Sequence, residues 1–320
     1  MGPLSDMDLR LLRVFRAVVD CGGMAAAELE LNIGVSTISR HIKDLETRLG
    51  LTLCRRGRAG FLLTPEGELI YSETLRLLAS TNAFRTRVDE IHQRMRGQLD
   101  FAVFDKTATN PKARIGEAIA TFHDRAPEVA LNLHVGTINA IESGVVDGRF
   151  QVGILPAHPR ADRLYGHDLF DEQMLLYCGS THPLFDAHHE GLDWADIGSE
   201  ALAGLGYQSP NMRISQQMRL QRQATGFDQE SIATLILSGR YLGFLPDHYA
   251  ESFVRDGRMR AIRPDRFRYA CTFVSVLRRS PEASRVARAF EQCLFAAHGV
   301  SVGGHPAPRL NSSDLAIEGG

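Results

Sequence analysis

The stretch Ser36-Thr-Ile-Ser-Arg-His-Ile-Lys-Asp-Leu-Glu-Thr-Arg-Leu-Gly50 carries the pattern that decides the N-terminal fold. Its apolar residues recur at spacings of four, three and four, which places them on one buried face of a helix. The opposite face keeps short hydroxyls and basic side chains, which a recognition helix presents to the major groove of DNA. The apolar residues are Ile38, Ile42, Leu45 and Leu49. The candidate DNA contacts are Val35, Ser36, Thr37, Ser39, Arg40 and Lys43.

Two further helices are predicted before this stretch. The first follows the apolar positions of residues 9–19 and closes near Cys21-Gly22-Gly23. A short alanine-rich helix then covers residues 24–31, and Asn32-Ile33-Gly34 separates it from the recognition helix. Two helices joined by a tight turn describe a helix-turn-helix.

Residues 51–63 predict a basic hairpin directly after the recognition helix. Two short apolar strands flank a tip of glycine and arginine, and such turn residues favour a hairpin. Arg55, Arg56 and Arg58 are better placed there for phosphates or the minor groove than for base edges in the major groove. A basic cluster alone is more often a solvated surface, so the position beside a helix-turn-helix is what favours a DNA-binding wing.

The segment Thr64-Pro65-Glu66-Gly67 predicts the start of a long helix, because threonine is a good N-cap and proline suits the first helical position. Two heptad registers follow over about 30 residues without an intervening strand. Packing on the chain's own core is the alternative, but the length favours a dimerising coiled coil. The registers are Ile70, Leu77, Phe84 and Ile91, and Thr74, Thr81, Val88 and Met95.

From Gly97 onward, predicted strands alternate with predicted helices, which implies a parallel sheet with right-handed crossovers. The expected strands are 99–104, 129–135, 151–155, 174–178, 202–207, 242–245 and 270–277. The expected helices are 111–122, 139–146, 214–224, 229–238 and 284–297. The tail from Gly303 is rich in Gly, Pro, Ser and Asn without periodicity, so we expect it to be disordered or loosely attached.

From Asp8 to His298 these motifs resemble the LysR-type family of transcriptional regulators. The densest match covers residues 11–67, with a serine and an arginine on the recognition helix, Leu45-Glu46, Leu49-Gly50, a wing arginine and Leu63-Thr-Pro-Glu-Gly67. The chain departs from the family pattern in two places. It has Gly34-Val35-Ser36-Thr37 where many members carry Ser-Gln-Pro-Ala, and Cys54 replaces the usual aromatic residue of the wing.

The C-terminal half is similar to the effector domain of this family, which shares a two-lobed fold with periplasmic solute-binding proteins. The resemblance implies a small-molecule ligand between the lobes, held by loops and helix N-termini. Ammonium and hydroxyl donors among the mapped positions suit a carboxylate or another anionic ligand; alternatively, Thr107 and Thr109 only cap a helix. The mapped positions are Lys106, Thr107, Thr109, Thr137, Tyr207, Gln208, Ser209, Glu230 and Phe244.

Several other classes of function find little support in the sequence. The five cysteines are scattered without a CxxC pair, which indicates neither a disulfide framework nor a zinc site. We also expect no metal at the histidines of residues 181–190, no cofactor and no catalysis, because no nucleophile elbow, phosphate loop or HExxH motif occurs. No signal peptide or membrane span is predicted, so we expect a cytoplasmic protein without a membrane partner.

The combined prediction is an α/β protein of three parts. An all-α winged helix-turn-helix covers residues 1–63, a linker and dimerisation helix covers 64–96, and a two-lobed α/β effector domain of the periplasmic-binding-protein type covers 97–300. Lobe 1 is expected at 97–173 and 278–300, lobe 2 at 174–277, and a tail at 301–320.

The predicted function is transcription regulation through promoter DNA, a small-molecule effector and RNA polymerase. We expect the chain to dimerise through the linker helix and to form a homotetramer, as the resemblance implies. Two alternatives stay open. One is a redox-sensing member of the family that uses Cys178 and Cys271. The other is a solute-binding or enzymatic domain with a non-functional helix-turn-helix.

Overall fold

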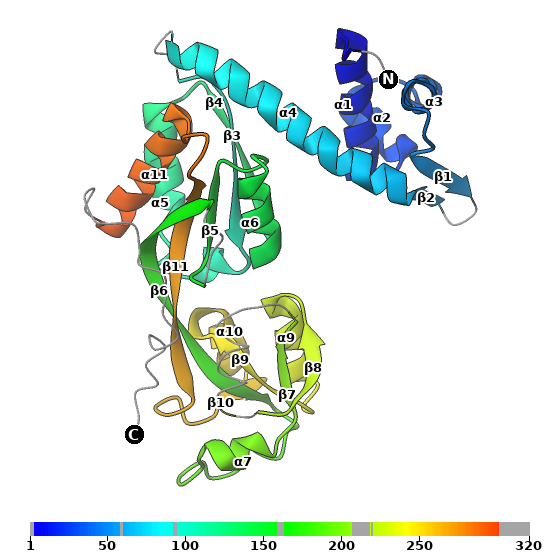
Figure 1. Cartoon of the computed structure of the whole chain (residues 1–320). Helices are drawn as coiled ribbons and strands as arrows, with labels where there is room; N and C mark the ends of the chain where they lie inside the picture. The colour runs from blue at the N-terminus through cyan, green and yellow to red at the C-terminus, as the bar shows by residue number, and fades with distance from the viewer. Residues whose placement is uncertain are drawn as a thin grey trace. The chain divides into compact units, whose positions relative to one another are not determined.

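A computed structural model describes residues 3–57, 60–91, 95–158, 163–206, 218 and 220–300. The chain folds into two compact units, one formed by residues 1–88 with 147–149 and the other by the remaining residues (Figure 1). Four predicted site residues, Arg58, Tyr207, Gln208 and Ser209, lie outside the described residues, as does the tail 301–320.

The first unit contains the predicted helix-turn-helix. Its helices are α1 (Asp6–Asp20), α2 (Met24–Leu31) and α3 (Val35–Leu49). The apolar faces of α1 and α3 meet around Phe15, Ile38 and Ile42, which are fully buried. Burial of these faces is the main force that holds two short helices together.

The ends of these helices follow from local sequence. Ser5 caps α1, because its side chain accepts the Asp8 N–H while the Asp8 carboxylate accepts the Ser5 N–H. Gly50 ends α3 with a φ of +69°, a left-handed conformation that glycine adopts at little cost.

A hairpin and a long helix complete the first unit. Strands β1 (Cys54–Gly57) and β2 (Gly60–Leu63) pair antiparallel as the predicted wing, and α4 spans Pro65–Ile91. The first part of the α4 heptad pattern packs on the chain's own core, and the coiled-coil pairing of the rest stays a prediction. Ile70 and Leu77 pack on the core of this unit, whereas Phe84 is 70% exposed.

The second unit is built on a nine-stranded sheet that comprises two lobes (Figure 1). In the first lobe β3 (Gly97–Phe104) pairs parallel with β4 (Val129–Gly136) and β5 (Val152–Pro156). In the second lobe β7 (Leu202–Leu205) pairs parallel with β8 (Arg222–Gly226) and β9 (Leu242–Pro246). The predicted parallel pairing holds for these strands, but the sheet is mixed, because β5 and β9 each pair antiparallel with a long strand that was also expected in the parallel sheet.

Two long antiparallel strands, β6 (Leu164–Gly179) and β11 (Arg268–Arg278), run through both lobes. The sequence predicted only the second half of β6. The expected lobe boundary between residues 173 and 174 falls inside this strand. A short strand β10 (Met259–Ala261) pairs with the end of β6.

Helices accompany the sheet in both lobes, and the longer ones were predicted. The first lobe has the short 3-10 helix η1 (Thr107–Thr109), α5 (Ile115–Arg125), α6 (Ile138–Val146) and α11 (Arg285–His298). The second lobe has α7 (Trp194–Gly198), α9 (Gln229–Leu237) and α10 (Asp247–Arg255). Elements that were not predicted are η1, α7, α10, β10 and the strand over residues 222–226.

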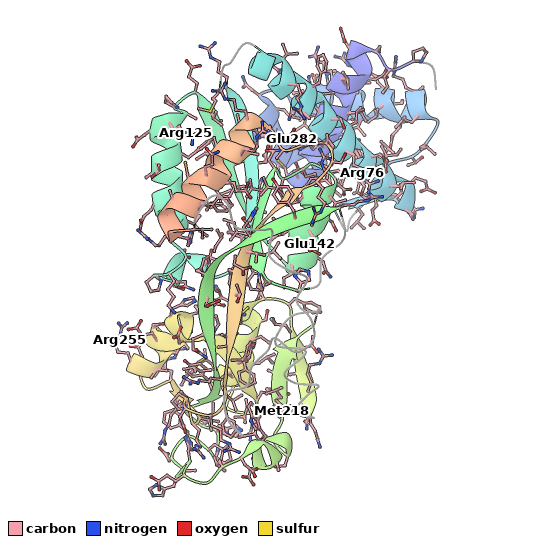
Figure 2. The ribbon with its side chains drawn as sticks, turned by 60° about the vertical axis from the view of Figure 1, so that its left-hand side comes forward. Arg76, Arg125, Glu142, Met218, Arg255 and Glu282 are labelled. Carbon is pink, nitrogen blue, oxygen red and sulfur yellow. The ribbon has the colours of Figure 1, made fainter. Side chains whose placement is uncertain are left out.

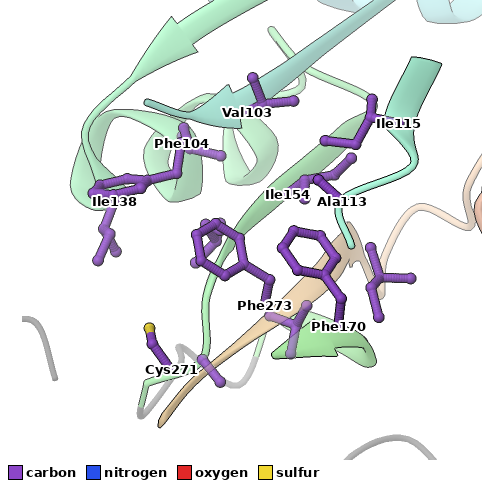
Figure 3. Close-up of a cluster of buried hydrophobic side chains, with 14 of the residues drawn as sticks. Val103, Phe104, Ala113, Ile115, Ile138, Ile154, Phe170, Cys271 and Phe273 are labelled. Carbon is purple, nitrogen blue, oxygen red and sulfur yellow. The ribbon is translucent and has the colours of Figure 1, made fainter. Parts of the chain in front are cut away.

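The core of the first lobe joins segments that are distant in sequence. Phe170 of β6 stacks on Phe273 of β11 with ring centroids 4.8 Å apart, and Phe104 lies 6.1 Å from Phe273 (Figure 3). On the surface, Arg125 of α5 donates to Gln292 of the adjacent helix α11 over 2.9 Å (Figure 2).

The end of one predicted helix is wrong, and its residues 214–217 and 219 lie outside the described residues. Residues 222–224, expected in a helix over 214–224, belong to strand β8 and pair parallel with β7. Tertiary pairing overrides the weak local pattern there, because a strand beside β7 satisfies backbone groups of both segments. Helix α5 also begins later than predicted, since Arg114 before it has a φ of +38°.

Candidate DNA-binding surface and lobe junction

Helix α3 presents a polar face on the side opposite its buried residues. Ser36, Arg40 and Lys43 are exposed, and Val35 is 37% exposed. Thr37 and Ser39 are half-buried at the margin of this face. The structure therefore leaves a hydroxyl and two basic side chains open to solvent on one helix surface, the arrangement needed to enter a major groove.

The wing is attached to α3 by a carboxylate that the sequence analysis did not single out. Glu46 Oε1 accepts the backbone N–H of Leu53 over 2.8 Å and that of Cys54 over 3.3 Å. Two backbone donors at the start of β1 are thereby satisfied by the recognition helix itself. The Leu45-Glu46 pair of the family pattern was the signal that pointed to it.

A buried carboxylate, Asp8, ties α3 to the start of α1. Arg48 near the end of α3 donates from Nη2 to Asp8 Oδ2 over 3.0 Å and also from Nε to Oδ1. The Arg48 hydrogen bond, with further bonds from Ser5, holds the pKa of Asp8 well below its usual range. Asp8 therefore stays ionised, and its bonds to Arg48 join α1 to α3. This contact helps to fix the orientation of the exposed face of α3.

The junction between wing and α4 explains the Thr64-x-x-Gly67 motif. Thr64 Oγ1 accepts the Gly67 N–H over 2.9 Å, and the Thr64 N–H donates to Leu53 O over 3.0 Å. A Cβ on Gly67 would lie 1.9 Å from Leu53 O. Only glycine allows the first turn of α4 to approach the chain this closely.

Two of the predicted wing arginines lie on β1. Arg55 is exposed and pairs in register with Leu62, and Arg56 pairs in register with Phe61. Arg55 is therefore available to a phosphate on the same unit as the exposed face of α3.

We call the contact region of the two lobes in the second unit the lobe junction; it comprises Asp105, Lys106, Thr109, Glu172, Gln229, Glu230, His248 and Tyr249. Asp105, directly after β3, accepts the backbone N–H of Gln229 at the first turn of α9, with 2.7 Å between Oδ2 and N. Burial raises the pKa of Asp105 to about 6. Asp105 opens the loop after β3 that was mapped to a ligand site, but it was not among the predicted effector residues.

Lys106 and Glu230, both predicted effector residues, meet at this junction. The Lys106 ammonium forms an ion pair with Glu230 Oε2 and lies 4.8 Å from the centre of the Tyr249 ring. Lys106 has a φ of +60°, which is uncommon for a residue with a side chain and is found most often at functional sites. Its charge is therefore directed from the first lobe to the second.

A chain of polar groups crosses the junction through the long strand β6. Thr109 Oγ1 lies 2.8 Å from His248 Nδ1, and His248 Nε2 lies 2.8 Å from Glu172 Oε1. Glu172 is 4% exposed, so this buried carboxylate depends on His248 and on Asn110 for hydrogen bonds. His248 and Glu172 were missed because neither lies in a recognisable motif.

Three other predicted effector residues have structural roles. Thr137 Oγ1 accepts the Ala140 N–H over 3.4 Å and so caps α6. Thr107 is 6% exposed within η1. Phe244 is 1% exposed in the core of the second lobe, where it contacts Tyr269 with ring centroids 5.2 Å apart.

The redox alternative concerns the thiols of Cys178 and Cys271. Burial raises the pKa of Cys178 to about 11 and raises that of Cys271 well above its usual value. At both positions burial disfavours the thiolate, which is the reactive form of a cysteine.

Among the described residues no group of three or more histidine, cysteine or acidic side chains is arranged to hold a metal ion. No helix in the described part of the chain has the length and apolar character needed to span a membrane.

Comparison with known proteins gives concordant matches for both units. Residues 9–68 match the family described as bacterial regulatory helix-turn-helix protein, lysR family, and residues 92–298 match the LysR substrate binding domain. The chain is 38% identical over 290 residues to the HTH-type transcriptional activator BauR of Pseudomonas aeruginosa, which covers 91% of this chain and 95% of that protein.

Solved structures have the same fold. The crystal structure of CbnR, a LysR family transcriptional regulator, aligns with a TM-score of 0.61 at 18% identity and covers 91% of this chain and 99% of CbnR. Full-length CbnR complexed with its target DNA aligns with a TM-score of 0.59 at 19% identity and covers 90% and 99%. With both units matched in order, this chain belongs to the LysR family of transcriptional regulators.

Proposed function

We propose that the chain binds promoter DNA as a dimer, with α3 in the major groove and the wing on the backbone. The observation that carries the proposal is the exposed set Ser36, Arg40 and Lys43 on one face of α3, held in place through Glu46 and Arg48. The crystal structure of CbnR with its target DNA supports the proposal by analogy of fold.

We propose further that the second unit binds a small-molecule effector between its lobes. Bonds between the lobes stabilise one arrangement, and a ligand changes DNA binding by its differential affinity for two arrangements. An anionic effector, expected from the sequence, is one candidate class. The chain binds the effector and does not convert it chemically. Two dimers form a tetramer, and this tetramer contacts RNA polymerase.

A gel shift with the DNA upstream of the chain's own gene tests the DNA-binding proposal. Arg40→Ala removes an exposed side chain of α3, and Arg255→Ala on α10 is a matched control that removes an exposed arginine of the second unit. We expect a specific complex that Arg40→Ala weakens at least tenfold and Arg255→Ala leaves unchanged. Absence of any sequence-specific complex would support the alternative of a solute-binding protein with a non-functional helix-turn-helix.

A further inference from the structure

The lobe junction contains two buried oxygens that lack a hydrogen-bond donor among the described residues. They are Asp105 Oδ1 and Gln229 Oε1. The two residues are joined by the 2.7 Å bond from the Gln229 N–H to Asp105 Oδ2, so the two acceptors lie in one region. Gln229 is 3% exposed. Buried acceptors are nearly always satisfied in folded proteins, so this pair points to a donor that binds from outside the chain.

Two acids add negative charge around Asp105, and the cation that acts on it is shared with another carboxylate. Asp228 and Glu172 both act on the Asp105 carboxylate and disfavour its ionised form. Lys106 is the cation that acts on it, and the Lys106 ammonium is already paired with Glu230. A buried carboxylate without its own counter-ion is unfavourable. The raised pKa of Asp105 is the expected consequence.

A protonated amine meets both requirements. Its N–H groups donate to two acceptors at once, and its charge neutralises the carboxylate. A water molecule or a hydroxyl group supplies donors but no charge. A carboxylate ligand supplies neither, and it would add a further negative charge beside Asp105.

We infer that the effector carries a protonated amine, which donates to Asp105 Oδ1 of the first lobe and Gln229 Oε1 of the second. This inference rests on the proposed function, because it names the chemical class of the effector for that site. The ligand enters when the lobes separate and the Lys106–Glu230 pair opens, and it is enclosed when the lobes close. Since the amine contacts both lobes, binding favours the closed arrangement.

The test is a thermal-shift screen of the full chain at pH 8, where Asp105 is ionised. The probes are primary alkylamines and amino acids of two to six carbons, each paired with its N-acetyl derivative and with the carboxylate of the same length. N-acetylation removes the positive charge and keeps the carbon skeleton. We expect at least one amine to raise Tm at 10 mM and its N-acetyl derivative to bind at least tenfold more weakly. Shifts by carboxylates or N-acetyl compounds alone, or no shift by any amine, overturn the inference.

Variants locate the amine once a binder is found. Asp105→Asn keeps an oxygen for the Gln229 N–H and removes the charge, so we expect a Kd at least tenfold higher for the amine. Gln229→Met removes the side-chain amide with the second acceptor and keeps the backbone N–H that bonds Asp105, so it should weaken binding severalfold; it also serves if Asp105→Asn fails to fold. Asp124→Asn, on the exposed face of α5, is the matched control. Unchanged amine affinity in the folded Asp105 or Gln229 variants overturns the inference.

Failure of the inference differs from failure of the proposed function. If carboxylates bind and change the gel shift while amines do not, the effector function holds and the amine class is wrong. If the chain forms no specific DNA complex, the proposed regulator function fails whichever ligand binds.

Discussion

The Asp105 carboxylate of the first lobe accepts the backbone N–H of Gln229 in the second lobe, with 2.7 Å between Oδ2 and N. The two residues are 124 positions apart in the chain. This half-buried carboxylate, which contacts the first turn of α9, links the position of the lobes to the ionisation of one side chain.

Asp105→Asn should change how the stability of the second unit depends on pH. The pKa of Asp105 is raised from 3.8 to about 6 in the folded state, chiefly by burial. The stabilisation from its proton is therefore fully present below pH 3.8 and is lost as pH rises through about 6. From pH 8 to pH 5 the native chain should gain about 1.4 kcal/mol from this group, and Asp105→Asn should lack that gain.

Urea unfolding followed by tryptophan fluorescence measures this effect. The chain has one tryptophan, Trp194, which packs against Phe267 in the second lobe, so the signal reports on the second unit. Asp124→Asn is the control. Parallel pH profiles for native chain and Asp105→Asn would show that Asp105 is not the titrating group.

Gly67→Ala should destabilise the DNA-binding unit. The added Cβ would lie 1.9 Å from Leu53 O, a backbone atom that cannot rotate away. Overpacking of this kind costs about 1–3 kcal/mol. Circular dichroism should give a lower melting temperature for this unit, and the gel shift should weaken, while the Trp194 signal stays native.

Gly116→Ala is the matched control for that substitution. Gly116 lies within α5, and a Cβ there meets nothing within 4 Å. Alanine is favoured over glycine in a helix, so this variant should be as stable as the native chain or more so. A Gly67→Ala variant that behaves like Gly116→Ala would contradict the close approach of α4 to Leu53.

Phe84→Glu should disrupt the proposed dimer. Phe84 is 70% exposed on α4, and Val88 one turn later is 39% exposed, so the chain itself does not bury this part of the heptad pattern. A charge at a heptad core position opposes coiled-coil pairing. Light scattering after gel filtration should report a smaller assembly. Leu69→Glu replaces an exposed leucine outside both heptad registers and should keep the native mass; equal masses for all three proteins would argue against pairing through α4.

Arg55→Ala should weaken binding to every DNA sequence alike. Arg55 is exposed on the wing, where a phosphate contact is expected. Loss of one such contact lowers the slope of log K against log salt by about 0.9. Fluorescence anisotropy over a salt series gives this slope for a specific and a random duplex. A change of sequence preference with an unchanged slope would instead place Arg55 on a base edge.

The N-terminal unit could be predicted almost completely from sequence, because its signals are local. The spacing of Ile38 and Ile42, the glycine at position 50 and the turn residues of the wing each act over a few residues. Helical periodicity, caps and hairpin turns are short-range effects of this kind. The alternation of strands and helices after Gly97 predicted the architecture of the second unit for the same reason.

Only the tertiary structure decided which polar side chains meet. Thr109 and His248 are 139 positions apart, and Lys106 reaches Glu230 across 124 positions. From sequence Lys106 is expected in a donor set for an anionic ligand; in the fold the Lys106 ammonium pairs with Glu230 and also acts on Asp105. Helices, turns and strand periods depend on neighbouring residues, but burial and charge compensation depend on groups brought together by folding, and these determine the chemistry of the lobe junction.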